Sequence, residues 1–181
     1  MSRIRPESSR RSVFQAETVV TIAIDRRGAI KRTIDNSMRE IDRTREKIKE
    51  AKKRRSQASG DKKANIDLEI GMLEAKVDYL FDVIDHQDIR RKLADWELVL
   101  AKAQFELAKV QLVKKHSIAF SGSIEDFENQ VKSIQADVDD LHKEVDAEAA
   151  QLKLEEEKWL AAKKRYYSSI GESSKGWWTE Q

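Results

Sequence analysis

The sequence predicts an all-α fold: an elongated antiparallel three-helix coiled-coil bundle that dimerises. The 181-residue chain contains one Pro and six Gly, so it has little of the turn chemistry that a sheet protein needs. Charged residues make up 38% of the chain and hydrophobic residues 39%, which leaves little material for a compact core. Apolar residues also recur on alternating steps of three and four, the spacing of a coiled-coil helix.

The first predicted helix runs from about residue 13 to residue 58. Ile34, Ile41 and Ile48 lie seven residues apart along it, as one apolar edge of a coiled-coil helix would require. Gly60 follows in the sequence "SGDK" and supplies a turn. Because this connection is short, we expect the next helix to run back alongside the first.

The second predicted helix, from about residue 61 to residue 116, carries two apolar stripes that are out of register. The polar run "DHQDIRRK", residues 85–92, separates them. Such a discontinuity bends a coiled-coil helix or changes its winding. If this run and "DRRG", residues 25–28, were true turns instead, the chain would form a five-helix bundle. The stripes comprise Ile66, Ile70, Leu73, Val77, Leu80 and Ile84, and then Leu93, Trp96, Leu100, Ala103, Leu107 and Val110.

The third predicted helix begins at Ile124 and extends for about 45 residues, with Ser123 as its N-terminal cap. Trp96 and Trp159 occupy apolar positions of the second and third helices, so we expect both in the core. The predicted domains are therefore a basic N-terminal segment, a three-helix coiled-coil domain and a polar C-terminal tail. They cover residues 1–12, 13–168 and 169–181.

Charge is unevenly distributed, although the formal net charge is only +2. Residues 1–60 hold 17 basic and 8 acidic residues, whereas residues 61–181 hold 18 and 25. The stretch from Lys47 to Lys63, at the predicted turn, has eight basic residues against two acidic ones. Each Lys or Arg near an anionic leaflet contributes on the order of 1 kcal/mol. The candidate lipid-binding residues are Lys49, Lys52, Lys53, Arg54, Arg55, Lys62 and Lys63.

The opposite end of the predicted hairpin is broadly apolar. Antiparallel pairing through Gly60 places a first-helix residue near the second-helix residue for which the two numbers sum to 120. Residues 13–24 then align with residues 96–107, and both segments are apolar on more than one side. A helix with two apolar sides needs cover on both, which a second copy could provide. The candidate dimer residues are Val19, Ile22, Leu98, Phe105 and Leu112.

The three-helix order, the interrupted helices, the apolar end and the basic tip together resemble the BAR-domain family over about residues 13–168. This resemblance is architectural and involves no short sequence motif. It implies a homodimer that presses a basic face onto a membrane. The basic first half and the acidic later part are also similar to the filament-forming ESCRT proteins and their bacterial relatives, in which copies join as a polymer.

Several other classes of function are disfavoured by the sequence. The chain has no Cys, and its three His have no second ligand at metal-binding spacing, so we expect no metal and no cofactor. The sequence shows neither a phosphate-binding loop nor a nucleophile with an evident base, so we do not expect an enzyme. The acidic third helix argues against nucleic acid. Trp177 and Trp178, in the polar tail, are candidates for a protein-partner motif.

These observations predict a peripheral membrane protein that senses or stabilises curvature through its basic tip. No run of 18 apolar residues is present. The Arg-rich start resembles a secretory signal, but Gln15 and Glu17 interrupt its apolar part. We therefore expect the cytoplasmic side of a membrane, with a periplasmic location left open. The alternative is a coiled-coil scaffold or adaptor that binds protein partners without touching lipid.

Overall fold

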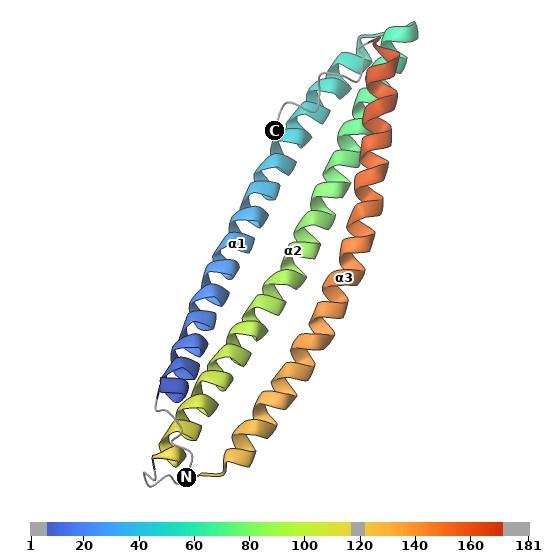
Figure 1. Cartoon of the computed structure of the whole chain (residues 1–181). Helices are drawn as coiled ribbons and strands as arrows, with labels where there is room; N and C mark the ends of the chain where they lie inside the picture. The colour runs from blue at the N-terminus through green and yellow to red at the C-terminus, as the bar shows by residue number, and fades with distance from the viewer. Residues whose placement is uncertain (1–6, 117–121, 172–181) are drawn as a thin grey trace. The chain divides into compact units, whose positions relative to one another are not determined.

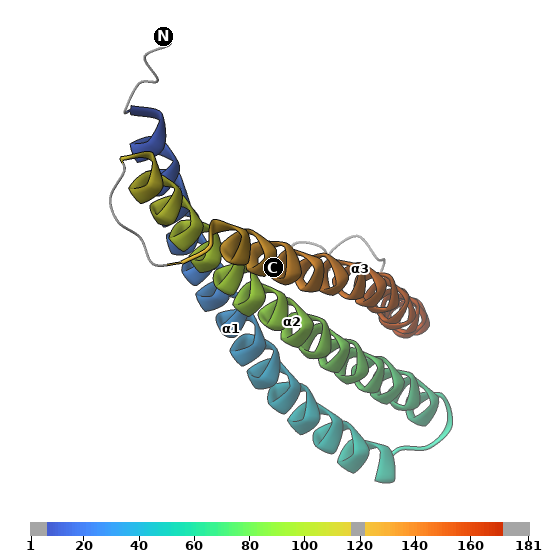
Figure 2. The same cartoon turned by 90° about the horizontal axis from the view of Figure 1, so that it is seen from below.

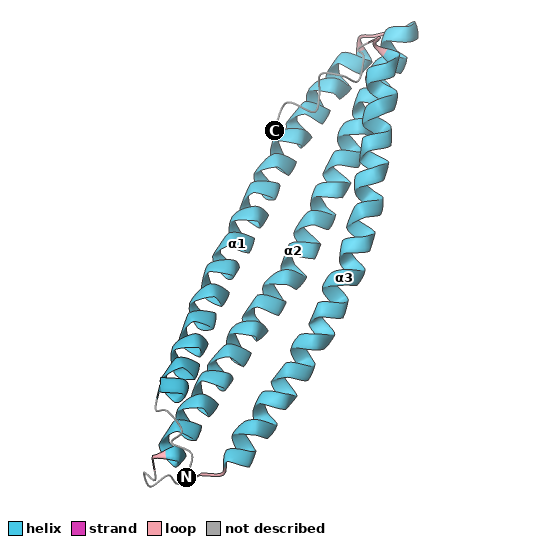
Figure 3. Cartoon of the chain, viewed as in Figure 1, coloured by secondary structure: helices cyan, strands magenta, loops and turns pink. Residues whose placement is uncertain are grey.

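The fold of the described chain is entirely helical. The structure, a computed structural model, describes residues 7–116 and 122–171, and Figure 3 shows helices joined by turns in these ranges, without strands. Helix α1 spans Glu7–Ser56, α2 spans Gly60–Lys115 and α3 spans Ile124–Ser169. The all-α prediction is confirmed. Within the described ranges there are three helices, as the spacing of apolar residues predicts.

The helix ends follow the local sequence. Helix α1 begins at Glu7, inside the stretch that the sequence assigns to a separate N-terminal segment. Gly60 has a φ of 57°, in the left-handed region where a side chain would be strained, and α2 begins at this residue. Ser123 directly precedes α3, whose first turn contains Glu125 and Asp126. Acidic side chains there interact favourably with the positive end of the helix dipole.

The chain divides into two compact units, and each helix contributes one stretch to each of them. Unit 1 consists of Met1–Arg32 and Asp88–Asp146. Unit 2 consists of Thr33–Gln87 and Ala147–Gln181. Within unit 2, the labelled α2 lies between α1 and α3 both in Figure 1 and in the turned view of Figure 2.

Both polar interruptions lie inside continuous helix. Residues 25–28 belong to α1 and residues 85–92 belong to α2, so the five-helix alternative is wrong. Within unit 1, Arg26 donates to Glu97 of α2 at 2.6 Å. The polar run of α1 therefore forms an ion pair with α2, because Arg26 lies at the helix surface within reach of the Glu97 carboxylate.

Unit 1 has a core between α2 and α3. Leu93, Leu100 and Ala103 of α2 are buried against Ile134 and Val138 of α3. Three half-buried residues of α3 extend this contact: Val131, Leu141 and Val145. With Ile134 and Val138 they follow one another at steps of three or four residues, about one helical turn each. Burying a large aliphatic side chain stabilises by about 1.5–3 kcal/mol, so this strip is the main attachment of α3 within unit 1.

Unit 2 has a core at the turn between α1 and α2. Ala51, Ile66 and Ile70 are buried together, with Ala58 packed against them. Further from the turn, Lys76 Nζ of α2 lies 2.6 Å from Glu40 Oε1 of α1. The α1–α2 interface of unit 2 thus has an apolar centre and charged edges.

The predicted apolar positions of α1 and α2 are largely confirmed as core. Ile34, Ile41 and all six residues of the first α2 stripe are buried. Ile48 and Leu107 are only half-buried, and Trp96 is 40% exposed, so the prediction that Trp96 lies in the core is wrong. Trp159 is half-buried, and its ring stacks on that of Tyr79. The repeat gives the helix face correctly, but a neighbouring helix does not cover that face evenly.

Candidate functional site

The candidate site is the end of unit 2 where α1 finishes and α2 begins. The last turn of α1 contains Lys53, Arg54 and Arg55. The final carbonyl groups of a helix carry partial negative charge, so cations in this turn stabilise the helix. Part of the basic cluster is therefore explained by the helix terminus alone. Ser56 also donates from Oγ to the carbonyl oxygen of Lys53 at 2.7 Å, which closes the helix end.

Arginine side chains of this turn pair with acids of α2. Arg54 Nη2 lies 2.7 Å from Glu69 Oε1, and Arg55 forms an ion pair with Asp67. The hydrogen bond from Arg55 lowers the pKa of the Asp67 carboxyl, and the hydrogen bond to Glu69 raises the pKa of Arg54. The acidic residues come from beyond the basic stretch, so the linear count of eight against two overstates the local positive charge.

Two more of the candidate lysines are also paired. Lys52 Nζ lies 2.9 Å from Glu74 of α2, and Lys49 Nζ lies 2.6 Å from Glu46 of the same helix. Both pairs are well exposed, and exposed ion pairs contribute about 0–1 kcal/mol. An anionic surface can therefore compete for these lysines at little cost.

Three of the seven candidate lipid-binding residues make no ion pair within the described part of the chain: Lys53, Lys62 and Lys63. All three are exposed. Lys63 contributes to lowering the pKa of Asp67 through its charge, but less than Arg55 does. These three lysines are thus predicted to make the strongest contacts between this end of unit 2 and an anionic surface.

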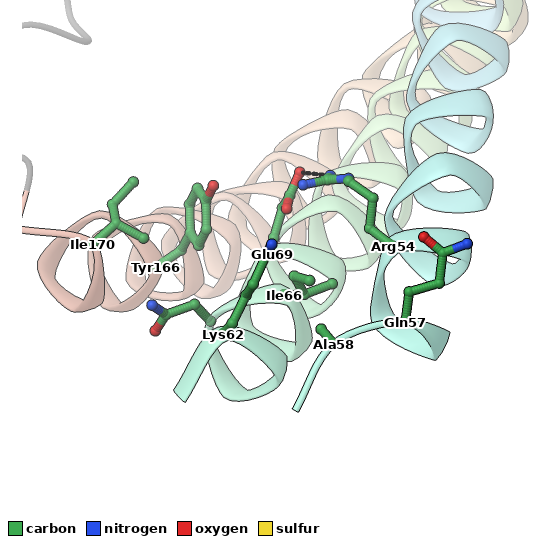
Figure 4. A pocket seen from close by; sticks show the side chains of 9 residues that line it. Arg54, Gln57, Ala58, Lys62, Ile66, Glu69, Tyr166 and Ile170 are labelled. Carbon is green, nitrogen blue, oxygen red and sulfur yellow. Dashed lines mark hydrogen bonds and ion pairs between the residues drawn. The ribbon is translucent and has the colours of Figure 1, made fainter. Parts of the chain in front are cut away.

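The end of α3 joins the same site, which the sequence prediction did not include. Tyr166, in the last turn of α3, and Ile170, directly after the helix, line one pocket together with Arg54 and Lys62 (Figure 4). Three consecutive cations, Lys163–Arg165, directly precede Tyr166 in the chain. The run "KKRYY" was the available signal, but the apolar repeat alone does not set the register of the third helix against the other two.

The candidate dimer residues fall into two groups. Val19 and Ile22 are 47% and 53% exposed. Leu98, Phe105 and Leu112 are half-buried, and Lys109 Nζ lies 4.2 Å from the centroid of the Phe105 ring. Unit 1 also exposes large apolar residues outside the predicted set: Phe14, Ile24, Trp96 and Val99.

Within residues 7–116 and 122–171, the other candidate features add no second site. Trp177 and Trp178 lie outside the described residues. His142 Nε2 lies 3.7 Å from Glu97, and no group of three potential metal ligands occurs among the residues that the structure describes. Of the described helices, none has an apolar stretch long and hydrophobic enough to cross a bilayer.

No protein-family model, characterised protein or solved structure matches this chain. The resemblances to BAR-domain and ESCRT proteins therefore stay predictions from the sequence.

Proposed function

We propose that this protein is a membrane-binding protein that attaches to anionic lipid through the basic end of unit 2. The observation that carries the proposal is the meeting of three helix segments there. The end of α1, the start of α2 and the end of α3 all contribute to one pocket lining. Two of its lining residues, Arg54 and Lys62, belong to the basic stretch Lys47–Lys63, and Tyr166 directly follows three cations, Lys163–Arg165.

The energetics favour a shallow, reversible attachment. Lys53, Lys62 and Lys63 are exposed and need break no ion pair to reach an anionic surface. At about 1 kcal/mol per cation near the surface, these three supply about 3 kcal/mol. The paired cations can add to this, because a lipid phosphate replaces an exposed carboxylate at little net cost. Such binding weakens as salt screens the charges.

The finer architecture of the proposal comes from the sequence. We propose an elongated antiparallel three-helix coiled coil that forms a homodimer through Val19, Ile22, Leu98, Phe105 and Leu112. The exposure of Val19 and Ile22 in unit 1 supports this proposal, since large apolar patches on a surface commonly mark association sites. Two copies would place two basic ends on one membrane and let the protein sense or stabilise curvature on its cytoplasmic side.

The proposal is tested by charge reversal at residues that make no ion pair. Glu substitution at Lys53, Lys62 and Lys63 should lower the partition coefficient on anionic vesicles by at least about 30-fold, because three favourable contacts become unfavourable. Glu substitution at Arg54 or Arg55 would be a poorer test. It would place the new carboxylate beside Glu69 or Asp67 of α2 and would disturb the helix packing.

A matched control keeps the same change in net charge. Lys114, Lys132 and Lys153 are exposed lysines outside Lys47–Lys63, and their triple Glu variant carries the same charge as the test variant. If the control loses as much vesicle binding as the test variant, the attachment depends on net charge alone and the proposed surface is wrong.

The scaffold function is a second candidate, favoured by the exposed apolar residues of unit 1. In that case Phe14, Trp96 and Val99 would bind another protein and lipid would play no part. Vesicle binding distinguishes the two, because an adaptor rod without lipid contact stays in the supernatant with anionic vesicles at low salt.

A further inference from the structure

The end of unit 2 contains a pocket of about 540 Å³ that lies between the ends of the helices (Figure 4). Figure 4 shows side chains from the end of α1, the connection, the start of α2 and the end of α3 around it. The lining combines charged, amide, hydroxyl and apolar groups. It consists of Arg54, Gln57, Ala58, Lys62, Asn65, Ile66, Glu69, Tyr166 and Ile170.

The charged groups of the pocket leave an excess of one positive charge. Arg54 and Lys62 are cations, and Glu69 is the single carboxylate of the lining. The side chain of Glu69 is only 18% exposed, whereas that of Arg54 is 54% exposed. Glu69 therefore holds the guanidinium from the inner side. A guanidinium has five N–H donors, so the Glu69 pair leaves donors for a second anion.

Lys62 lies where it can act with Arg54. In Figure 4 its side chain extends toward the Arg54–Glu69 pair. Lys62 makes no ion pair with any described residue. One flexible ammonium beside one fixed guanidinium suits a singly charged phosphate diester, because the charge of the diester balances the excess in the lining.

The uncharged groups suit hydroxyls. Gln57 and Asn65 each provide an amide donor and an amide acceptor, and Tyr166 provides a phenolic hydroxyl. Such groups satisfy both the donor and the acceptor of an alcohol, which a purely cationic surface cannot do. The remaining lining, Ala58, Ile66 and Ile170, is apolar and could face the less polar part of a ligand.

We propose that this pocket binds a phospholipid headgroup made of one phosphodiester and a polyhydroxylated alcohol, such as glycerol or inositol. Arg54 and Lys62 take the phosphate, while Gln57, Asn65 and Tyr166 read the hydroxyls. The inference rests on the proposed membrane function and adds a preference among lipids of equal charge. A serine headgroup has the same net charge, but it carries an ammonium and a carboxylate in place of the hydroxyls that Gln57, Asn65 and Tyr166 would bind, which disfavours it.

The test compares vesicles that carry equal fractions of phosphatidylglycerol or phosphatidylserine at the same ionic strength. The native chain should bind the glycerol lipid at least about fivefold more tightly, as expected for one or two additional hydrogen bonds. The double variant Gln57→Ala and Asn65→Ala should bind the two lipids equally. The control variant Gln104→Ala and Asn129→Ala, at two exposed positions of unit 1, should keep the native preference.

A soluble arm separates the lipid headgroup from free phosphate. Glycerophosphoglycerol should displace the native chain from vesicles more effectively than inorganic phosphate at matched ionic strength. The headgroup inference is overturned if native protein binds both anionic lipids equally, or if inorganic phosphate competes as well as the polyol diester. Those results would still be consistent with membrane attachment through the basic end of unit 2. Failure to bind any anionic vesicle, in contrast, refutes both the headgroup pocket and the proposed function.

Discussion

The ring of Tyr79 stacks on the ring of Trp159, with centroids 5.2 Å apart and planes inclined by 15°. Tyr79 belongs to α2 and Trp159 to α3, so the pair attaches α3 within unit 2. None of the described α3 residues in this unit is fully buried, although several are half-buried. The stack is therefore one of the apolar contacts that attach this part of α3, which also contains Tyr166 of the pocket lining.

Replacing Trp159 by Ala should destabilise the fold and detach the end of α3. A half-buried Trp in an aromatic stack should cost about 2–3 kcal/mol, below the range for a fully buried Trp. Urea unfolding gives the free energy of unfolding. The control Leu154→Ala removes a side chain of the same helix that is 53% exposed, and should cost less than about 1 kcal/mol. An equal decrease in the free energy of unfolding of the two variants would show that the aromatic stack contributes no more than an exposed side chain.

The ion pair between Glu40 and Lys76 should be worth more than the pairs at the exposed surface. Lys76 Nζ lies 2.6 Å from Glu40 Oε1, and the side chain of Glu40 is 35% exposed and that of Lys76 25% exposed. A double-mutant cycle with Glu40→Gln and Lys76→Met should give a coupling energy of about 0.5–1 kcal/mol after allowance for solvent screening. The matched cycle at Glu46 and Lys49, both 67% exposed, should give less than about 0.5 kcal/mol.

The same pair should show a definite pH dependence. The hydrogen bond from Lys76 lowers the pKa of Glu40 below its ordinary value of 4.5, outweighing the opposing effect of burial. The stabilisation is therefore complete above pH 4.5 and is lost as the pH falls through the lowered pKa. A coupling energy that stays constant down to the acid limit of the folded state would contradict this assignment.

Asp82 should destabilise the protein at neutral pH. Burial raises the pKa of Asp82 above 3.8, and the charges of Glu155, Asp85, Asp78 and Glu148 raise it further. Asp82→Asn should therefore raise Tm at pH 7 by about 1–3 °C, as a change below 1 kcal/mol would in a chain of this size. The gain should shrink as the pH falls through the raised pKa and vanish below 3.8, where Asp82 is neutral in both states.

An exposed carboxylate serves as the control for Asp82. Asp137→Asn, at an exposed position of α3, should change Tm less than Asp82→Asn does at pH 7. If Asp82→Asn lowers Tm at pH 7, the carboxylate has a stabilising partner and the assignment of an unfavourable environment is wrong.

The proposed dimer depends on the exposed apolar residues of α1 in unit 1. The double variant Val19→Gln and Ile22→Gln should reduce the sedimentation mass from that of a dimer to that of a monomer at micromolar concentration. Gln is a good helix former, so helicity should be retained. The control Met38→Gln and Leu154→Gln changes two equally exposed apolar residues of unit 2 and should leave the dimer intact. A monomeric native chain would refute the dimer directly.

Much of the helical architecture could be predicted from the sequence, because its causes are local. Gly60 has the positive φ that a turn residue needs, and α3 begins directly after Ser123. The buried positions Ile34 and Ile41 follow the seven-residue repeat. Trp96 shows the limit of this reasoning: a repeat identifies one face of a helix, but only the neighbouring helix determines how much of that face is covered.

The chemistry of the site was less predictable, since it depends on contacts between distant segments. The pairing expected from the sequence, in which the two residue numbers sum to 120, places Arg54 near residue 66, within one helical turn of its partner Glu69. That ion pair could therefore have been found by applying the register to the charges. The contribution of Tyr166 could not, because no sequence feature fixed the position of α3 against the other helices.

The most direct test of the account is co-sedimentation of the native chain with vesicles of matched size, anionic or neutral, at low and at high salt. The protein should pellet with anionic vesicles at low salt, and this binding should weaken as salt screens the lysines. Native protein that stays in the supernatant with anionic vesicles at low salt would contradict the membrane function, and the chain would then be a coiled-coil scaffold for protein partners.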